Sequence, residues 1–138
     1  MGYHQYTSYS LQLGNPLAFA TMNDSTNYFF SMGQVSTSVS IARIYIPRKG
    51  IIRYVNVSWY HATTDCSTED TTVAIRKNDT TDATIFTGSL ANANSPQIVT
   101  NLNLPVEVGD FITVKISTPH WATNPQASYF RCALEVQC

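Results

Sequence analysis

The segment LPVEVGDFITVKISTPHWATNP, residues 104–125, combines a turn, a strand and an aromatic loop. The Gly-Asp pair within it is typical of a tight turn, and the residues after the pair alternate between apolar and polar. Alternation with a period of two predicts a half-buried strand over residues 111–117, with Ile112, Val114 and Ile116 facing inward. The loop that follows this strand holds two prolines, a histidine and a tryptophan.

The same period of two returns along most of the chain. The longest predicted strand covers residues 51–60, and its core face is expected to carry Ile51, Arg53, Val55, Val57 and Trp59. Other predicted strands cover residues 39–46 (with a bulge near Ala42 and Arg43), 71–78, 83–88, 97–106 and 128–137. No window shows the apolar spacing of a long helix. About seven or eight short strands predict an all-β fold, an antiparallel β-sandwich or barrel.

Length and composition fit a single domain with a weakly charged surface that is suited to contact with another molecule. The chain has 138 residues, of which 43% are hydrophobic and only 12% are charged. Charged residues make up about 25% of an ordinary soluble domain, so Thr, Ser and Asn must form much of this surface. The net charge of −1 and the lack of a basic run argue against a nucleic-acid partner.

The chain carries no apolar stretch near the roughly 20 residues that span a membrane, so we expect no membrane insertion. The N-terminus, MGYHQYTSYS, lacks the basic and apolar segments of a signal peptide, which predicts a chain made without its own export signal. The three cysteines, Cys66, Cys132 and Cys138, favour free thiols, with a 66–138 bridge as the alternative. No C-x-x-C pair occurs, so a zinc site is not expected.

The first part of the chain is rich in aromatic residues but shows little alternation. We predict an extended, partly ordered N-terminal arm over residues 1–35 and the sandwich domain over residues 36–138. The alternatives are a short helix and packing of the arm on its own domain. The predicted assembly surface combines the arm with the outward face of the longest strand: Tyr3, Tyr6, Tyr9, Phe19, Ile52, Tyr54 and Tyr60. Coverage of that face by a second sheet of the same chain is equally open.

The ordered set of strands and turns resembles a known family. The segment IYIPRKGIIRYVNVSWY (44–60), the Val106, Gly109, Asp110 turn and its alternating strand, and the Thr-Pro-x-Trp-Ala-Thr-Asn-Pro loop (118–125) carry the likeness. They resemble the small jelly-roll domains that end phage tail fibres and decorate phage heads. More loosely, they are similar to the trimeric jelly rolls of complement C1q and tumour necrosis factor. The chain has no collagen-like stalk and no heptad run.

The resemblance implies a jelly-roll sandwich, a homotrimer, a virion location and a non-enzymatic structural role. We therefore expect a capsid-decoration or head- or tail-attached module of a phage-like virus, with other capsid or tail proteins as partners. The alternative is a tail-fibre tip that binds a host receptor or glycan, or a cell-surface carbohydrate-binding module.

The aromatic loop supplies the candidate ligand site for that alternative. The Trp121 ring is suited to stacking on a sugar, and its polar neighbours are suited to bonding hydroxyls. The candidate ligand-binding residues are His120, Trp121, Asn124 and Gln126. The competing interpretation is that Trp121 plugs the end of the sandwich.

Catalytic and metal chemistry have weaker signals. His61, Asp65 and Cys66 lie close together in sequence with Glu69 and Asp70, but on a polar loop that offers poor support for nucleophilic catalysis. Neither G-x-S-x-G nor H-E-x-x-H occurs. The acids Asp65, Glu69, Asp70, Asp79 and Asp82 do not follow the spacing of a calcium loop and are expected to cap turns. We therefore predict no enzyme activity, no catalytic residues, no metal and no cofactor.

Overall fold

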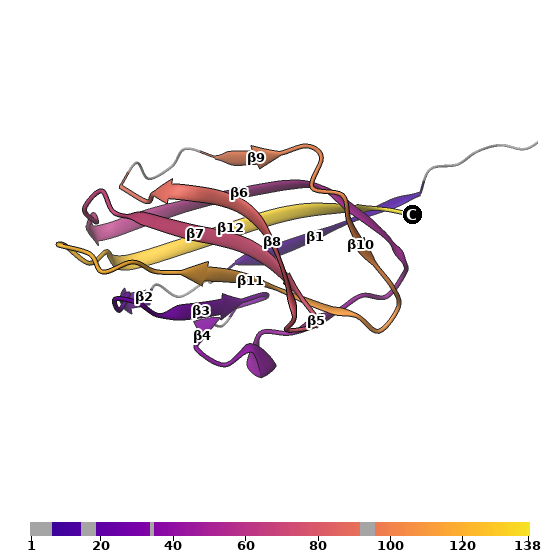
Figure 1. Ribbon diagram of the computed structural model, residues 1–138, viewed down its shortest axis with the longest axis horizontal. Coiled ribbons are helices and arrows are strands. Elements are labelled where there is room, and N and C mark those ends of the chain that lie inside the picture. The colour runs from indigo at the N-terminus through magenta and orange to yellow at the C-terminus, as the bar shows by residue number, and fades with distance from the viewer. Residues whose placement is uncertain (1–6, 15–18, 34, 92–95) are drawn as a thin grey trace, which may run out of the picture.

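The computed structural model describes residues 7–14, 19–33, 35–91 and 96–138, and these form two antiparallel sheets packed face to face (Figure 1). The first sheet, sheet A, has the strand order β1-β12-β6-β10, with β2 paired to β12 and β9 paired to β6. Its strands are β1 (Ser8–Gly14), β2 (Phe19–Thr21), β6 (Gly50–Thr64), β9 (Gln97–Val99), β10 (Leu104–Val106) and β12 (Gln126–Gln137).

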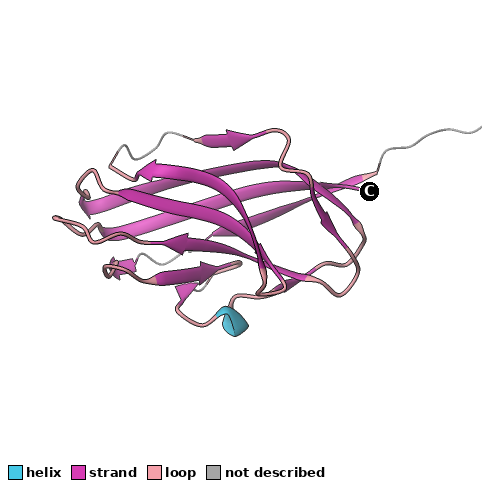
Figure 2. Cartoon of the chain, in the orientation of Figure 1, coloured by secondary structure: helices cyan, strands magenta, loops and turns pink. Residues whose placement is uncertain are grey.

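The second sheet, sheet B, has the order β4-β3-β11-β7-β8, with β5 paired to β11. Its strands are β3 (Asn27–Phe30), β4 (Val35–Ser36), β5 (Ile44–Tyr45), β7 (Asp70–Lys77), β8 (Thr81–Ser89) and β11 (Phe111–Ser117). Figure 2 shows the single helical element of the described chain, the short 3-10 turn η1 (Val39–Ile41). The expected all-β sandwich is confirmed.

The strand connections are those of a jelly roll. The first strand, β1, pairs with the last, β12; β3 pairs with β11; β6 pairs with β10; and β7 pairs with β8. Such nested pairing of early strands with late ones arises when one long hairpin is folded over itself, which places alternate strand pairs in opposite sheets. Because most pairs join residues far apart in sequence, the fold depends on long-range contacts.

The Gly-Asp turn before β11 has the expected tight geometry. Gly109 has a φ of +87°, a value that favours glycine, and its amide donates to the Ile46 carbonyl. The Asp110 carboxylate accepts hydrogen bonds from the Glu107 amide (2.8 Å) and from the Asn78 side chain (2.8 Å). The turn therefore fixes where β11 begins, between β7 and β3.

The core lies between the two sheets, where the predicted inward faces of three strands meet. Ile112, Val114 and Ile116 of β11 are fully buried, and so are Val73 and Ile75 of β7. In β12 the buried positions are Phe130, Cys132, Leu134 and Val136, as predicted. The rings of Phe30 and Phe130 meet across the interior with 6.1 Å between their centroids.

The phase predicted for the start of β6 is wrong. The pairing of β6 with β12 shifts between Tyr54↔Glu135 and Ile52↔Val136, so that Arg53 is an extra residue in the ladder. This bulge reverses the alternation before it: Ile52 is fully buried and Ile51 is exposed. Ile52 is therefore a core residue and does not belong to the predicted assembly surface.

The strand predicted over residues 39–46 is also wrong. Residues 39–41 form the 3-10 turn η1, and only Ile44 and Tyr45 are extended. Serine side chains compete with strand pairing here, because the Ser36 hydroxyl accepts the Ser38 amide and the Ser38 hydroxyl bonds that of Ser40.

The predicted division at residue 35 does not match the strand pairing. β1 forms one edge of sheet A, β3 lies within sheet B, and Leu13, Met22 and Phe30 are core residues. Tyr9 packs against the core and donates from its hydroxyl to the Arg48 carbonyl (2.7 Å), so it is engaged within its own chain. Tyr3, Tyr6 and the Phe19 side chain lie outside the described residues.

Candidate functional site: the outer face of sheet A

The outer face of sheet A is made of short rows of side chains that cross β1, β12, β6 and β9. One row joins Gln12, Ala133, Asn56 and Ile98, and the next joins Ser10, Glu135 and Tyr54. Further along the sheet, Arg131 lies opposite Ser58 and Tyr129 opposite Tyr60. Only Arg131 and Glu135 carry charge in these rows, so most of this face is uncharged.

Large apolar and aromatic side chains on this face reach solvent. The exposed fraction is 41% for Tyr54, 47% for Tyr60 and 63% for Ile98. The Tyr60 and Tyr129 rings stack with centroids 6.4 Å apart. Tyr54 and Tyr60 thus point outward as predicted. Ile98, an apolar residue of the predicted strand over residues 97–106, is exposed here although it is not among the predicted assembly residues.

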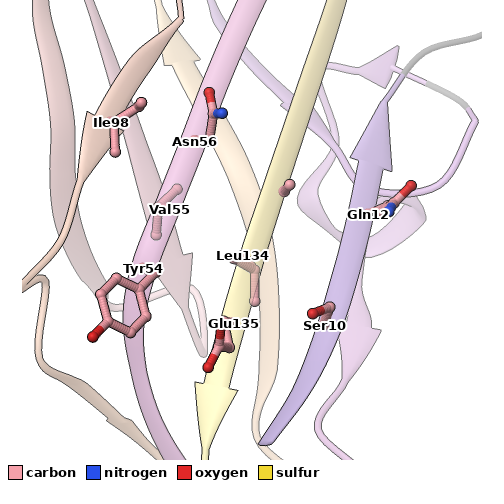
Figure 3. Close-up of a pocket in the computed structure, with 9 residues that line it drawn as sticks. Ser10, Gln12, Tyr54, Val55, Asn56, Ile98, Leu134 and Glu135 are labelled. Atoms are coloured by element: carbon pink, nitrogen blue, oxygen red, sulfur yellow. The ribbon is translucent and has the colours of Figure 1, made fainter.

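A shallow groove of about 240 Å³ runs over the first two rows (Figure 3). Ile98 and Tyr54 lie on one side of it, and Ser10 and Gln12 lie on the other. The small side chain of Ala133 lies between Gln12 and Asn56 in the strand register. These side chains offer apolar surface and neutral hydrogen-bonding groups. An exposed face of this kind is suited to burial of apolar area against another molecule.

The aromatic loop after β11 is tied to the body of the sandwich. Trp121 is only 3% exposed and belongs to the core cluster. Asp24 holds the loop from the opposite side: it accepts from the Trp121 amide (3.2 Å) and the Asn124 amide group (2.8 Å), and lies 2.6 Å from His120 Nδ1. The buried Trp121 ring has no free face for a sugar, so the plug interpretation describes this loop.

The other three candidates for ligand binding are separated by the structure. The His120 side chain is 86% exposed and paired with Asp24, and Asn124 donates to the Met22 carbonyl as well as to Asp24. Gln126 is exposed and pairs through its backbone with β2 and β6. The polar groups of His120 and Asn124 serve the attachment of the loop, and the four residues do not form one ligand surface.

The Asp24 contacts predict a loss of stability in acid. Partial burial raises the pKa of Asp24, but the hydrogen bonds from the Trp121 amide and Asn124, with His120, outweigh it, and the pKa falls below its ordinary value. A lowered folded-state pKa means that the ionised carboxylate stabilises the fold above about pH 4 and that this contribution is lost as the pH falls further. Asp24→Asn should lower stability at pH 7 and flatten the acid limb of the profile, measured by urea unfolding between pH 7 and pH 2.5.

The matched control for this prediction is Glu107→Gln, which changes an exposed carboxylate on a distant turn and should keep the wild-type profile. The pKa values of Glu69, Asp82 and Asp110 are also lowered, so part of the acid limb should persist in Asp24→Asn. An unchanged limb in Asp24→Asn would show that the loop is not held by this carboxylate.

His61 and Cys66 do not form a catalytic pair. The His61 side chain is buried, with Nδ1 at 2.7 Å from the Ser128 hydroxyl and Nε2 at 3.2 Å from the Leu90 carbonyl. Burial lowers the pKa of His61 and raises the pKa of the Cys66 thiol to about 11. A thiol that is protonated at neutral pH is a poor nucleophile. All three cysteines are free, with Cys66 and Cys132 buried and Cys138 exposed.

Comparison with known proteins gives no family. No protein-family model matches the chain, and no curated protein matches it. A solved structure titled Desmodium yellow mottle tymovirus aligns over 99% of this chain and 90% of its own, with 11% identity and a TM-score of 0.37. A TM-score this low does not establish a shared fold, so the strand topology of this chain remains the basis for its classification. No helix in the described residues is long and apolar enough to cross a membrane.

Proposed function

We propose that this chain is a non-enzymatic structural protein of a virus particle, a trimeric jelly-roll module attached to the head or tail of a phage-like virus. The outer face of sheet A is the assembly surface. The observation that carries this proposal is the exposure of Tyr54, Tyr60 and Ile98 on one nearly uncharged sheet face.

Three further features support it. The nested strand order is the jelly roll that viral capsid proteins and lectins share. The histidine and thiol that lie close together, His61 and Cys66, are buried and unsuited to nucleophilic catalysis. Trp121, the candidate sugar-stacking residue of the glycan-binding alternative, is part of the core. The threefold arrangement and the virion location rest on the resemblance of the strand and turn order to phage-type jelly rolls.

The test is the solution mass of the purified chain, measured by light scattering across a range of concentrations. A mass near 46 kDa, three times the 15.3 kDa protomer, is expected. Ile98→Glu should weaken association at least about 10-fold, because assembly would bury an unpaired charge. Ile98 is 63% exposed, so its replacement leaves the protomer folded.

The matched control is Val108→Glu, which adds the same charge at a residue 68% exposed on the turn before β11. Its mass should equal that of the wild type. A wild-type chain that stays at 15.3 kDa over the whole range would contradict the trimer, and equal effects of the two variants would contradict the assignment of the interface to sheet A.

A further inference from the structure

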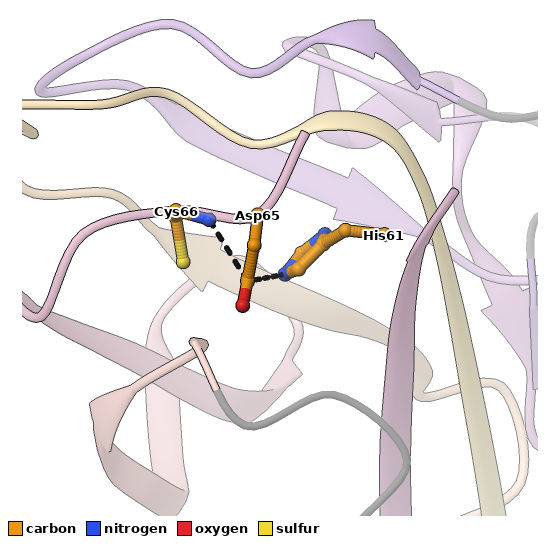
Figure 4. Close-up of side chains that lie close together, drawn as sticks. All are labelled: His61, Asp65 and Cys66. Carbon is orange, nitrogen blue, oxygen red and sulfur yellow. Dashed lines mark hydrogen bonds and ion pairs between the residues drawn. The ribbon is translucent and has the colours of Figure 1, made fainter. Parts of the chain in front are cut away.

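Three potential metal ligands of different chemistry meet where β6 ends. His61 lies in β6, and Asp65 and Cys66 follow directly after the strand. Their ligand atoms, an imidazole nitrogen, a carboxylate oxygen and the thiol sulfur, all lie within 4.8 Å of one another. In Figure 4 the Asp65 carboxylate lies between the His61 ring and Cys66, with the Cys66 amide donating to it at 2.9 Å.

The orientation of the His61 ring is fixed by hydrogen bonds at both nitrogens. Nδ1 lies 2.7 Å from the Ser128 hydroxyl on the neighbouring strand β12, which fixes the ring plane. Nε2 is less well engaged, because its partner, the Leu90 carbonyl, lies at 3.2 Å and already accepts the Trp59 indole N–H at 2.8 Å. The Asp65 carboxylate lies 4.0 Å from Nε2, which is too far for a hydrogen bond.

Of the other two ligands, Cys66 is buried and Asp65 is open to solvent. Cys66 is only 7% exposed, and its sulfur receives a backbone hydrogen bond from Leu90. The Asp65 side chain is 57% exposed and gives an ion a path in from solvent. Zinc binds imidazole nitrogen, thiolate sulfur and carboxylate oxygen at about 2.0–2.3 Å, so the three ligand atoms, which lie within 4.8 Å of one another, must move closer together on binding. The exposed Asp65 side chain can adjust to the ion, and the buried His61 and Cys66 side chains must shift as well.

We propose that His61, Asp65 and Cys66 form a binding site for a divalent ion of the zinc class. The ion is bound by His61 Nε2, a carboxylate oxygen of Asp65 and Cys66 Sγ, with water in the fourth position. In the ion-free ring the Leu90 carbonyl can only accept, so Nε2 carries the proton and Nδ1 accepts from the Ser128 hydroxyl. Binding of the ion moves this proton to Nδ1, which then donates to Ser128, and releases the proton of the Cys66 thiol to solvent. The mixed sulfur, nitrogen and oxygen set disfavours Ca²⁺ and Mg²⁺, which prefer oxygen ligands.

Such an ion would stabilise one end of the sandwich. It would hold the first residues of the loop that leads into β7 against the end of β6. This role is independent of the assembly proposed for the outer face of sheet A, because the site faces the end of the β6 strand and shares no residue with the groove.

The test is titration of the reduced full-length protein with Co²⁺, followed by displacement with Zn²⁺. We expect one ion per chain with a Kd near or below roughly 1 µM and a near-ultraviolet thiolate-to-cobalt charge-transfer band. Cys66→Ser should remove the band, and Asp65→Asn should raise the Kd by at least about 10-fold. A Zn²⁺ concentration of 100 times the Kd should raise the Tm by roughly 5–10 °C.

Cys138→Ser and Asp70→Asn serve as controls, since they change a thiol and an acid outside the cluster, and both should keep the band and the affinity. Circular dichroism should show that each variant is folded. A Kd weaker than about 100 µM, a band that survives in Cys66→Ser, or a band lost in Cys138→Ser would each overturn the site. The solution mass, measured with and without Zn²⁺, separates this result from the test of the proposed trimer.

Discussion

Phe130→Ala should destabilise the protein by about 3–5 kcal/mol, a large part of the stability of a domain this size. Phe130 is fully buried on β12, the strand that pairs with β1, β2 and β6 and so holds sheet A together. Its ring packs on Phe30 of the opposite sheet, so its loss leaves a cavity between the two layers. Urea unfolding followed by tryptophan fluorescence measures the change.

The matched control is Tyr45→Ala, in which an aromatic ring that is 58% exposed on β5 is removed. Its only described aromatic partner is Phe111, at 5.9 Å between centroids, and we expect a loss of no more than about 1 kcal/mol. Equal losses for the two variants would show that the sheets are not packed through Phe130.

Trp121→Ala should cost about 3–5 kcal/mol as well, because the ring fills the end of the core under the loop after β11. If Trp121 plugs the end of the sandwich, Trp121→Ala should lower the stability of the protomer, and the folded fraction of the variant should keep the wild-type solution mass. Thermal unfolding and light scattering on the same sample measure both quantities.

His120→Ala is the control for Trp121, since it changes the adjacent residue but removes a side chain that is 86% exposed. Loss of its exposed pairing with Asp24 should change the stability far less than loss of the Trp121 ring does. If Trp121→Ala left the midpoint of unfolding within the range of His120→Ala, the ring could not be the plug of the sandwich and would again be a candidate for ligand contact.

Alternation predicted the strands that are paired on both sides. β11 and β12 lie inside their sheets, so every second residue must enter the core, and Ile112 and Phe130 could be assigned to the interior without a structure. β1 carries the same signal in Tyr9, Leu11 and Leu13, but the three-residue spacing of the N-terminal tyrosines obscured it. The predicted arm, residues 1–35, therefore includes β1, a strand of sheet A.

The candidate sites were harder to predict, because each depends on which segments meet. Tyr54 and Tyr60 were placed on the outer face correctly, since they alternate with the buried Val55, Val57 and Trp59. Ile52 was misplaced because the bulge at Arg53 arises from pairing with β12, more than 80 residues away in sequence. The sequence predicts that Asp65 and the acids after it cap turns. The proximity of Asp65 to the His61 ring depends on the path of the chain after β6.

An all-β domain with a largely uncharged surface follows from the sequence, because period-two alternation and composition are local properties of the chain. The positions of three side chains depend instead on long-range contacts in the folded chain. Trp121 is buried where Asp24 holds its loop against the sandwich, and Ile52 turns inward at a bulge. The His61 ring lies near Asp65 and Cys66 in an orientation that Ser128 and Leu90 fix. Each depends on a partner distant in sequence, and no local pattern specifies such a partner.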